Sequence, residues 1–167
     1  MTENGFDIVP LKKQDRAAFS CGVEALDRYL KTQATQDMRR LMSSCYVALD
    51  RQTEAIAGYY TLSAGDVLLS GLPESLIRRL PRYPAAPVAR IGRLAVDQRY
   101  QGRKLGGALL LNAAMRAVRS EVAVFALVVD AKDDKAADFY RHYQFSAFDS
   151  DPLRLVAPLE TFRKLLG

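Results

Sequence analysis

The sequence has few of the residues that bind metals or form nucleophilic triads. It contains one histidine, His142, and two cysteines, Cys21 and Cys45. Because histidine and cysteine supply most transition-metal ligands, and because a Ser-His triad needs a histidine base, these numbers argue against a metal centre and against such a triad. Two isolated cysteines are typical of reduced thiols that pack as small apolar side chains in a cytoplasmic protein. We expect two free thiols and no bound metal.

Long apolar runs are also missing. No stretch approaches the roughly 20 uninterrupted apolar residues that a membrane-spanning helix requires. Residues 1–15 lack the basic segment followed by an apolar segment that marks a secretory signal. No repeat, low-complexity tract or Gly/Ser linker interrupts the 167 residues, of which 49% are hydrophobic and 26% charged. The sequence therefore predicts a single domain over residues 1–167 that lies in the cytoplasm and does not contact a membrane.

Acidic residues are nearly absent from one long segment. Between Arg78 and Arg119 the chain has ten lysines and arginines but a single acid, Asp97. The net charge of the whole chain is +5. A run of one charge is often only a solvated face of the protein, and that interpretation stays open. The functional interpretation is an anionic partner, which means a phosphorylated cofactor, nucleic acid or both.

Hydrophobic periodicity and turn residues predict strands and helices that alternate along the chain. In the first half we expect strands at 6–11, 44–49 and 55–69, helices at 19–42 and 73–80, and a proline-rich loop at 81–87. In the second half we expect strands at 88–96, 122–129, 145–148 and 153–156, and helices at 102–119, after Asp133 and at 159–165. Interleaved strands and helices around one mixed sheet place the fold in the α/β or α+β class, with three layers.

The segment from Arg93 to Leu110 is the most informative. A strand ends at Asp97, and a basic loop from Gln101 to Gly107 opens a long helix. This arrangement directs unpaired backbone N–H groups and the positive end of the helix dipole toward one point. Three glycines without Cβ atoms would let a pyrophosphate approach the backbone. The loop matches neither the Walker pattern nor GxGxxG, and its glycines could instead serve packing alone.

A second candidate feature is the helix within residues 133–145, where Tyr140 follows Phe139. An isolated tyrosine on an apolar helix face is more often a core residue whose hydroxyl is hydrogen-bonded than a catalyst. Here the helix follows the basic loop by some thirty residues, across an apolar strand. This order and spacing favour a functional interpretation of Tyr140.

The loop and the tyrosine together resemble the GNAT acetyltransferase superfamily. Its phosphate-loop pattern, Q/R-x-x-G-x-G/A, aligns onto Gln101, Lys104 and Gly106, with Lys104 where the pattern has glycine. The resemblance implies a GNAT fold with a mixed, mostly antiparallel central sheet, helices on both faces, and acetyl-CoA as acetyl donor. It implies that Tyr140 is the general acid. The cofactor-binding residues that it implies are Leu94, Ala95, Val96, Gln101, Gly102, Arg103, Lys104, Leu105, Gly106, Gly107 and Tyr143.

Four further blocks, residues 19–30, 57–67, 90–97 and 153–159, resemble the GNAT toxins of bacterial type II toxin–antitoxin modules, the TacT and AtaT type. This resemblance implies a toxin that acetylates the α-amine of aminoacyl-tRNA and inhibits translation. It also implies a homodimer, neutralised by a ribbon-helix-helix antitoxin in a repressor complex that contacts DNA only through the antitoxin. The first alternative is an ordinary GNAT N-acetyltransferase that acts on a small amine, a peptide or a protein N-terminus. The second is a catalytically silent CoA- or nucleic-acid-binding module, against which Tyr140 and the glycines of the loop argue.

Basic residues outside the phosphate loop are candidates for contacts with tRNA phosphates. They are Lys31, Arg39, Arg40, Arg78, Arg79, Arg82, Arg90 and Arg93. Each could be an ordinary surface charge, so the prediction concerns the group rather than any one member. We expect no dedicated general base, because an aminoacyl α-amine has a pKa near the terminal-amine value of roughly 8.

Overall fold

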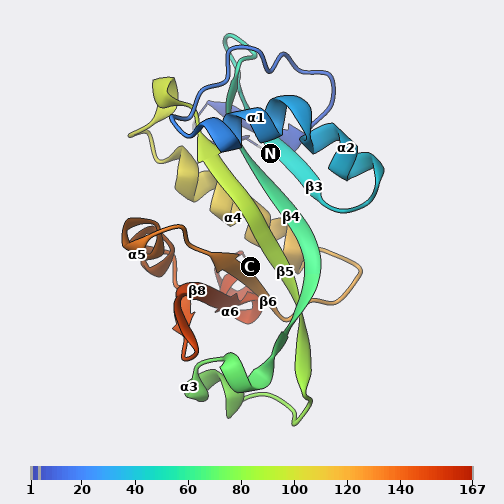
Figure 1. Cartoon of the computed structure of the whole chain (residues 1–167), viewed down its shortest axis with the longest axis vertical. Coiled ribbons are helices and arrows are strands. Elements are labelled where there is room, and N and C mark those ends of the chain that lie inside the picture. Colours follow the sequence, from blue (N-terminus) through green and yellow to red (C-terminus); the bar gives the residue numbers. More distant parts are fainter. Residues whose placement is uncertain (1, 4, 167) are drawn as a thin grey trace. The chain divides into compact units, whose positions relative to one another are not determined.

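A computed structural model describes residues 2–3 and 5–166 (Figure 1). In chain order the elements are β1 (Thr2–Glu3), β2 (Phe6–Pro10), α1 (Glu24–Thr32), α2 (Ala34–Arg39), β3 (Ser44–Asp50), β4 (Ile56–Leu68), η1 (Leu69–Gly71), α3 (Glu74–Ile77), β5 (Ala85–Val96), η2 (Gln98–Tyr100), α4 (Leu105–Val118), β6 (Ala126–Asp130), α5 (Asp134–His142), β7 (Ser146–Phe148), β8 (Asp151–Pro158) and α6 (Leu159–Leu166).

The strands of the described residues form one sheet, with hydrogen-bonded order β1-β2-β3-β4-β5-β6-β8-β7. The β5–β6 pair is parallel, whereas β1–β2, β2–β3, β3–β4, β6–β8 and β7–β8 are antiparallel. The predicted mixed, mostly antiparallel sheet is therefore confirmed. The chain divides into two compact units, which are described separately below. Unit 1 comprises Met1–Ser63 and Gly92–Ala113, and unit 2 comprises Ala64–Ile91 and Ala114–Gly167.

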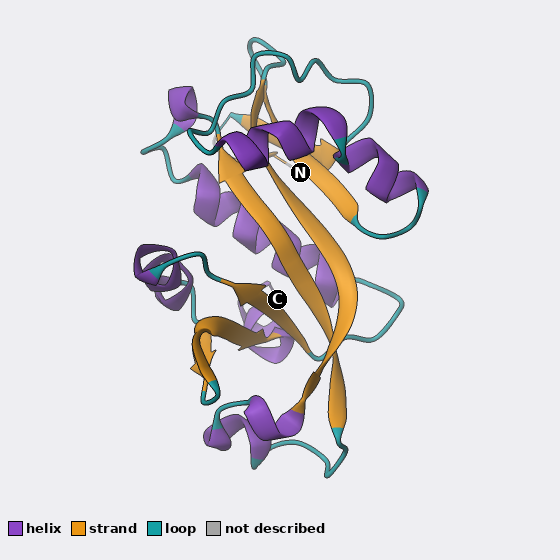
Figure 2. Ribbon diagram, viewed as in Figure 1, coloured by secondary structure: helices purple, strands orange, loops and turns teal. Residues whose placement is uncertain are grey.

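Two adjacent tyrosines show how the layers of unit 1 form. Successive side chains of a strand point to opposite faces of the sheet. On β4, the Tyr59 hydroxyl donates to the carbonyl oxygen of Leu26 on α1 at 2.7 Å, whereas the Tyr60 hydroxyl donates to Oδ1 of Asn112 on α4 at 2.7 Å. The α1–α2 pair and α4 thus cover opposite faces, as Figure 2 shows. The predicted three layers are present in this unit.

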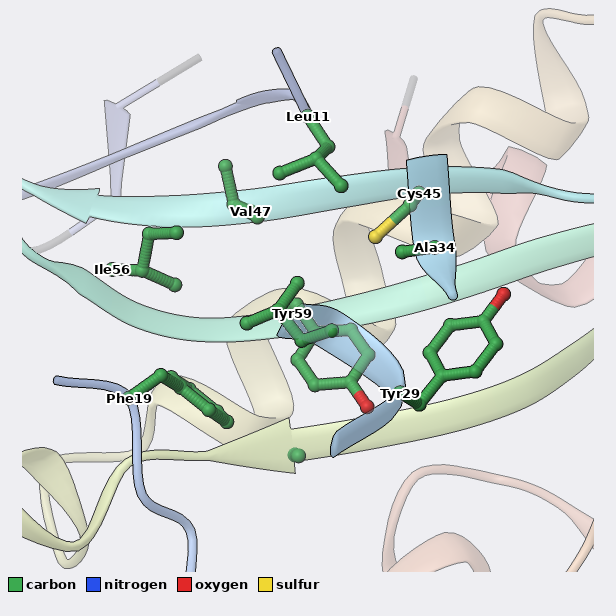
Figure 3. Close-up of a cluster of buried hydrophobic side chains, with 10 residues drawn as sticks. Leu11, Phe19, Tyr29, Ala34, Cys45, Val47, Ile56 and Tyr59 are labelled. Atoms are coloured by element: carbon green, nitrogen blue, oxygen red, sulfur yellow. The ribbon is translucent and has the colours of Figure 1, made fainter. Parts of the chain in front are cut away.

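The core of unit 1 lies between the α1–α2 pair and the sheet (Figure 3). Its buried residues are Leu11, Phe19, Tyr29, Leu30, Ala34, Cys45, Val47, Ile56, Tyr59 and Ala95. Burial raises the pKa of Cys45 to about 12, so this thiol packs as a neutral apolar group. Both cysteines are free thiols, and Cys21 is half-buried.

On the opposite face, Gly58 permits a close approach of β4, β5 and α4. A Cβ at this position would lie 2.9 Å from the Ala95 carbonyl oxygen and 2.9 Å from a methyl group of Leu109. Both distances are too short for a side chain, and the carbonyl belongs to the backbone of a paired strand. The glycine therefore lets the first turns of α4 pack directly on the sheet.

Unit 2 is built on the parallel pair of β5 and β6, in which Val88–Ile91 align with Ala126–Val129. The first four residues of β6 are buried, as expected for an apolar central strand covered on both faces. One buried cluster lies around α3 and η1 and contains Val67, Leu69, Leu72, Leu76, Val88, Ala126, Val128, Phe148 and Val156. The helices α5 and α6 both contact β8.

Several predicted helix boundaries were wrong, two of them for a local backbone reason. The helix expected over 19–42 begins only at Glu24, because Gly22 has φ +92° and Val23 is extended. It is broken again at Gln33, whose φ of −120° is not helical. The helix expected over 73–80 shortens to Glu74–Ile77.

Three further boundaries differ in the second half of the chain. The helix expected over 102–119 starts at Leu105. The strand expected over 122–129 starts at Ala126, so residues 122–125 lie outside it. The strand expected from Val88 begins at Ala85, so the proline-rich loop is shorter than predicted.

The predicted Asp133 cap is confirmed, because its carboxylate accepts from the Ala136 N–H at 2.8 Å. Within the described ranges, no helix is long and apolar enough to cross a membrane.

Candidate active site

The turn after β5 in unit 1 is organised by one buried carboxylate. Asp97 is 1% exposed, and its Oδ1 accepts from the backbone N–H and from Nε of Arg99, both at 2.9 Å. Its Oδ2 accepts from the Ser20 N–H at 2.9 Å and from a second guanidinium nitrogen of Arg99 at 3.1 Å. Burial alone would raise the pKa of Asp97, but these hydrogen bonds outweigh it and lower the pKa. Asp97 is therefore ionised and fixes the η2 turn.

The loop that follows has two residues in the left-handed backbone region. Gly102 has φ +81°, and a Cβ there would meet no atom within 4 Å, so its backbone faces open space. Lys104, which replaces the glycine of the family pattern, has φ +62°. A left-handed conformation costs a non-glycine residue roughly 1–2 kcal/mol. The loop thus adopts the glycine-like shape even though the residue is lysine.

The first turn of α4 supplies the groups that would hold a phosphate. The helix begins at Leu105, and the first N–H groups of any α-helix have no acceptor within the helix. These donors lie directly after the exposed cations Arg103 and Lys104. The N–H groups, the positive helix end and the open backbone at Gly102 fit the pyrophosphate of a nucleotide cofactor.

Other predicted cofactor residues of unit 1 contact this loop. The Gln101 side-chain amide donates to the carbonyl oxygens of Val96 at 3.0 Å and Cys21 at 3.3 Å. The Arg103 guanidinium lies 5.2 Å from the ring centroid of Phe6 and 5.4 Å from that of Tyr100. In β5, Ala95 is buried, while the flanking Leu94 and Val96 are half-buried. Unit 1 therefore brings Leu94–Val96 and the loop together.

Tyr140 lies on α5 in unit 2 and differs from an ordinary core tyrosine. It is 8% exposed, and its ring packs between Phe139, with a centroid distance of 5.2 Å, and Phe145, at 5.6 Å. Its hydroxyl makes no hydrogen bond to any residue that the structure describes, yet no side-chain oxygen among those residues is both sealed from solvent and unpaired. The hydroxyl is therefore accessible. Burial of the ring raises the pKa of Tyr140 to about 12, which keeps the hydroxyl protonated.

Tyr143 closes the same helix. It is half-buried, and its ring lies 5.2 Å from that of Phe139 and 5.1 Å from that of His142, centroid to centroid. The predicted site residues thus fall into a loop set in unit 1 and a tyrosine set on or next to α5 in unit 2.

The predicted tRNA-contacting residues of unit 1 are Lys31, Arg39, Arg40 and Arg93. The first three are exposed on or beside α1 and α2, and none of them forms an ion pair within the described ranges. Arg93 is half-buried on β5, where its guanidinium carbon lies 3.5 Å from the ring centroid of Tyr29. The Tyr29 hydroxyl donates in turn to Asp37 at 2.7 Å. The stack holds Arg93 in one orientation.

The predicted tRNA-contacting residues of unit 2 are Arg78, Arg79, Arg82 and Arg90. Arg78 pairs with Glu74 at 3.1 Å, Arg79 with Glu160 at 2.9 Å, and Arg90 with Asp130 at 3.0 Å. Exposed pairs of this kind stabilise a fold by only about 0–1 kcal/mol. A phosphate that binds Arg78, Arg79 or Arg90 therefore has to displace an ion pair, although a weak one.

Sequence reasoning missed Asp97 and the Ser20–Cys21 segment as parts of the site. The acid could have been suspected, because it is the single acid between Arg78 and Arg119. The contact with Ser20 leaves no local signal, since the two residues are separated by 77 positions.

Comparison with known proteins identifies the family of the chain. The family model described as the acetyltransferase (GNAT) family matches residues 13–145. A protein of Mycobacterium tuberculosis named tRNA-acetylating toxin is 34% identical over 155 residues, which cover 92% of this chain and 91% of that protein.

Solved structures of the toxin AtaT are also similar. AtaT complexed with acetyl-methionyl-tRNAfMet has a TM-score of 0.87 and 26% identity, and covers 97% of this chain and 99% of that one. A tyrosine-to-phenylalanine mutant of AtaT bound to the C-terminus of the antitoxin AtaR has a TM-score of 0.79 and 25% identity, over 97% and 98% of the two chains. AtaTR bound with acetyl-CoA has a TM-score of 0.81 and 26% identity, over 99% and 100%. The chain belongs to the acetyltransferase (GNAT) family.

Proposed function

We propose that this protein is the toxin of a type II toxin–antitoxin module, and that it transfers the acetyl group of acetyl-CoA to the α-amine of aminoacyl-tRNA, which inhibits translation. The observation that carries the proposal is similarity along nearly the whole chain to a tRNA-acetylating toxin and to AtaT in complex with an acetylated aminoacyl-tRNA. The similarity extends beyond the acetyl-CoA loop, so it concerns the acceptor as well as the donor.

Acetyl-CoA is the acetyl donor. Its pyrophosphate would bind the N–H groups of the loop and of the first turn of α4, next to Gly102 and Gly106, where the helix dipole favours negative charge. Arg103 and Lys104 add two cations there. The backbone of Leu94, Ala95 and Val96 would bind the pantetheine arm as an added strand.

Tyr140 is the proposed general acid. The neutral acceptor nitrogen attacks the thioester carbonyl and forms the new C–N bond, the C–S bond breaks, and the departing thiolate takes the Tyr140 hydroxyl proton. The proton that the nitrogen loses passes through solvent and restores the tyrosine. A proton donor for this step must be protonated at neutral pH, and its hydroxyl must not already donate a hydrogen bond to a neighbouring side chain. Tyr140 meets both requirements, because burial raises its pKa and its hydroxyl has no partner within the described residues.

The basic residues are the proposed tRNA surface. In unit 1, Lys31, Arg39 and Arg40 offer to tRNA phosphates exposed cations that form no salt bridge among the described residues, and Tyr29 orients Arg93. In unit 2, Arg78, Arg79, Arg82 and Arg90 offer further cations. Charged tRNA is a cytoplasmic substrate, so the proposal also assigns the protein to the cytoplasm.

The proposed partners follow from the same similarity. AtaT has been solved with the C-terminus of its antitoxin, so we infer that an antitoxin neutralises this protein too. We extend this inference to an antitoxin of the ribbon-helix-helix class, to a homodimer of the toxin, and to DNA contact only through the antitoxin. A short neighbouring reading frame with the ribbon-helix-helix pattern, and a purified toxin that sediments as a dimer, are the expected observations.

The test of the proposed acceptor is acetyl transfer from labelled acetyl-CoA. The label should enter aminoacyl-tRNA and not the same tRNA without its amino acid. Free amino acids should react far less efficiently, because they lack the binding energy of the tRNA body. Equal kcat/KM values for free amino acids and for aminoacyl-tRNA would refute the toxin function and favour a small-amine acetyltransferase.

A further inference from the structure

The Gln101 side chain is held between two backbone segments of unit 1. Its Nε2 atom lies 3.0 Å from the carbonyl oxygen of Val96, at the end of β5, and 3.3 Å from that of Cys21, which is 80 residues away in sequence. Both neighbours are acceptors, so the nitrogen of the amide and not its oxygen faces them. A glutamine amide nitrogen carries two N–H groups. Both are used within the protein, which leaves none for a phosphate.

Cys21 is itself fixed, so this contact anchors the loop to a defined point. The Cys21 N–H donates to Oδ1 of Asp27 on α1 at 2.9 Å. Its neighbour Ser20 donates to Asp97 at 2.9 Å and accepts from the Gln98 N–H at 2.8 Å. The Ser20–Cys21 segment therefore holds both ends of the turn from Asp97 to Gln101.

The residues after this anchor need to be held in place. Gly102 and Lys104 are both in the left-handed region, and the lysine is there at a cost of roughly 1–2 kcal/mol. A strained conformation persists only where surrounding contacts impose it. Gln101 is the last residue before this stretch, and its side chain connects the stretch to β5 and to Cys21.

We propose that Gln101 is a positioning residue: its amide ties the acetyl-CoA loop to the Val96 and Cys21 carbonyls, so that the backbone N–H groups of the loop and of α4 converge on the pyrophosphate. The side chain itself does not contact the cofactor. This inference rests on the proposed function only in its use of acetyl-CoA as the ligand.

The decisive variant is Gln101→Glu, which keeps the size of the side chain but replaces the N–H donors by carboxylate oxygens facing two carbonyls. The Kd for acetyl-CoA, measured by calorimetry, should rise by about 10-fold or more, as expected for lost donors and unsatisfied acceptors. The kcat at saturating acetyl-CoA should stay close to the wild-type value, because the reacting groups are unchanged. Gln101→Arg retains side-chain N–H donors and should bind acetyl-CoA nearly as well as the wild type.

The matched control is Gln52→Glu, the same chemical change at an exposed turn position of unit 1. It should leave the Kd unchanged. If Gln101→Glu does not fold, Gln101→Ala and Gln101→Arg decide, with weaker binding expected for alanine only. Equal Kd values for the wild type and Gln101→Glu, or for the alanine and arginine variants, overturn the positioning role. The calorimetry needs no acceptor, so a failure of the aminoacyl-tRNA hypothesis would not affect this result.

Discussion

The buried tyrosines of unit 1 and Tyr140 of unit 2 are buried to a similar degree, but their hydroxyl groups differ in hydrogen bonding. Tyr29, Tyr59, Tyr60 and Tyr100 are 0–7% exposed, and Tyr140 is 8% exposed. Each hydroxyl of the first group donates to a protein oxygen at 2.7 or 2.8 Å. The Tyr140 hydroxyl has no such acceptor within the described ranges. Hydrogen bonding, rather than burial, therefore distinguishes a tyrosine that stabilises the fold from one that is available for chemistry.

The largest expected effect comes from Tyr140→Phe. Removing the hydroxyl should lower kcat by about 10²- to 10⁴-fold, the range of a lost general acid. Stability should change by less than about 0.5 kcal/mol, because the hydroxyl makes no hydrogen bond to any described residue. Initial rates and thermal denaturation measure the two quantities. A folded variant with wild-type activity would show that Tyr140 has only a structural role.

The predicted tRNA-contacting arginines differ in a similar way, because some form salt bridges with carboxylates and others form none among the described residues. Replacing Arg39 and Arg40 by glutamine should raise the KM for aminoacyl-tRNA about 10-fold and flatten its dependence on salt, since two phosphate contacts are lost. Replacing Arg78 and Arg79, which already pair with Glu74 and Glu160, removes the same charge and should have a smaller effect. Steady-state kinetics at several salt concentrations compare the pairs, and acetyl-CoA binding serves as the control. Identical effects would mean that ion pairing does not matter here.

Tyr59→Phe is the counterpart of Tyr140→Phe. It removes the hydrogen bond that the Leu26 carbonyl oxygen on α1 accepts from the Tyr59 hydroxyl, which should lower the free energy of unfolding by about 0.5–1.5 kcal/mol. The kcat should remain near the wild-type value, because Tyr59 has no assigned role in the reaction. Urea denaturation and initial rates separate the two effects. A large loss of kcat without loss of stability would contradict the comparison.

The smallest expected effect is on the pH dependence of the reaction. The acceptor amine must be neutral, so kcat/KM should rise with pH and level off above about pH 8. Because burial raises the pKa of Tyr140 to about 12, loss of its proton should cause no decline up to about pH 10. Initial rates with a base-stable amine acceptor give the profile. Tyr140→Phe should show the same rise of kcat/KM with pH, at a lower rate throughout. If the wild-type rate declines below pH 9 and the variant's rate does not, the pKa of Tyr140 is lower than proposed.

Much of the fold could be predicted from local patterns. The hairpin of β3 and β4, the apolar β6 and the Asp133 cap each depend on residues within a few positions of one another. The predicted helix over 19–42 was wrong, because its apolar spacing continues across Gly22 and Gln33, where the backbone leaves the helical region. Spacing reports which residues could share a face but not where the backbone turns.

The candidate site shows the same limit more clearly. The phosphate loop and Tyr140 could be located in the sequence, because each has a local signature. The supports of the loop could not, since they join Gln101 to Cys21 and Asp97 to Ser20. Neither could the free hydroxyl of Tyr140, because the absence of an acceptor depends on every residue that surrounds it.

Asp97 has a consequence for how a polyanion approaches the protein. It is the single acid between Arg78 and Arg119, and its carboxylate is buried and paired with Arg99. That segment therefore exposes no carboxylate of its own, and all of its exposed charged side chains are cations. A field of one sign speeds diffusional encounter with an oppositely charged ligand, and the gain falls steeply with ionic strength. Asp97 thus lets the chain keep a carboxylate as a structural anchor without repelling an incoming nucleic acid.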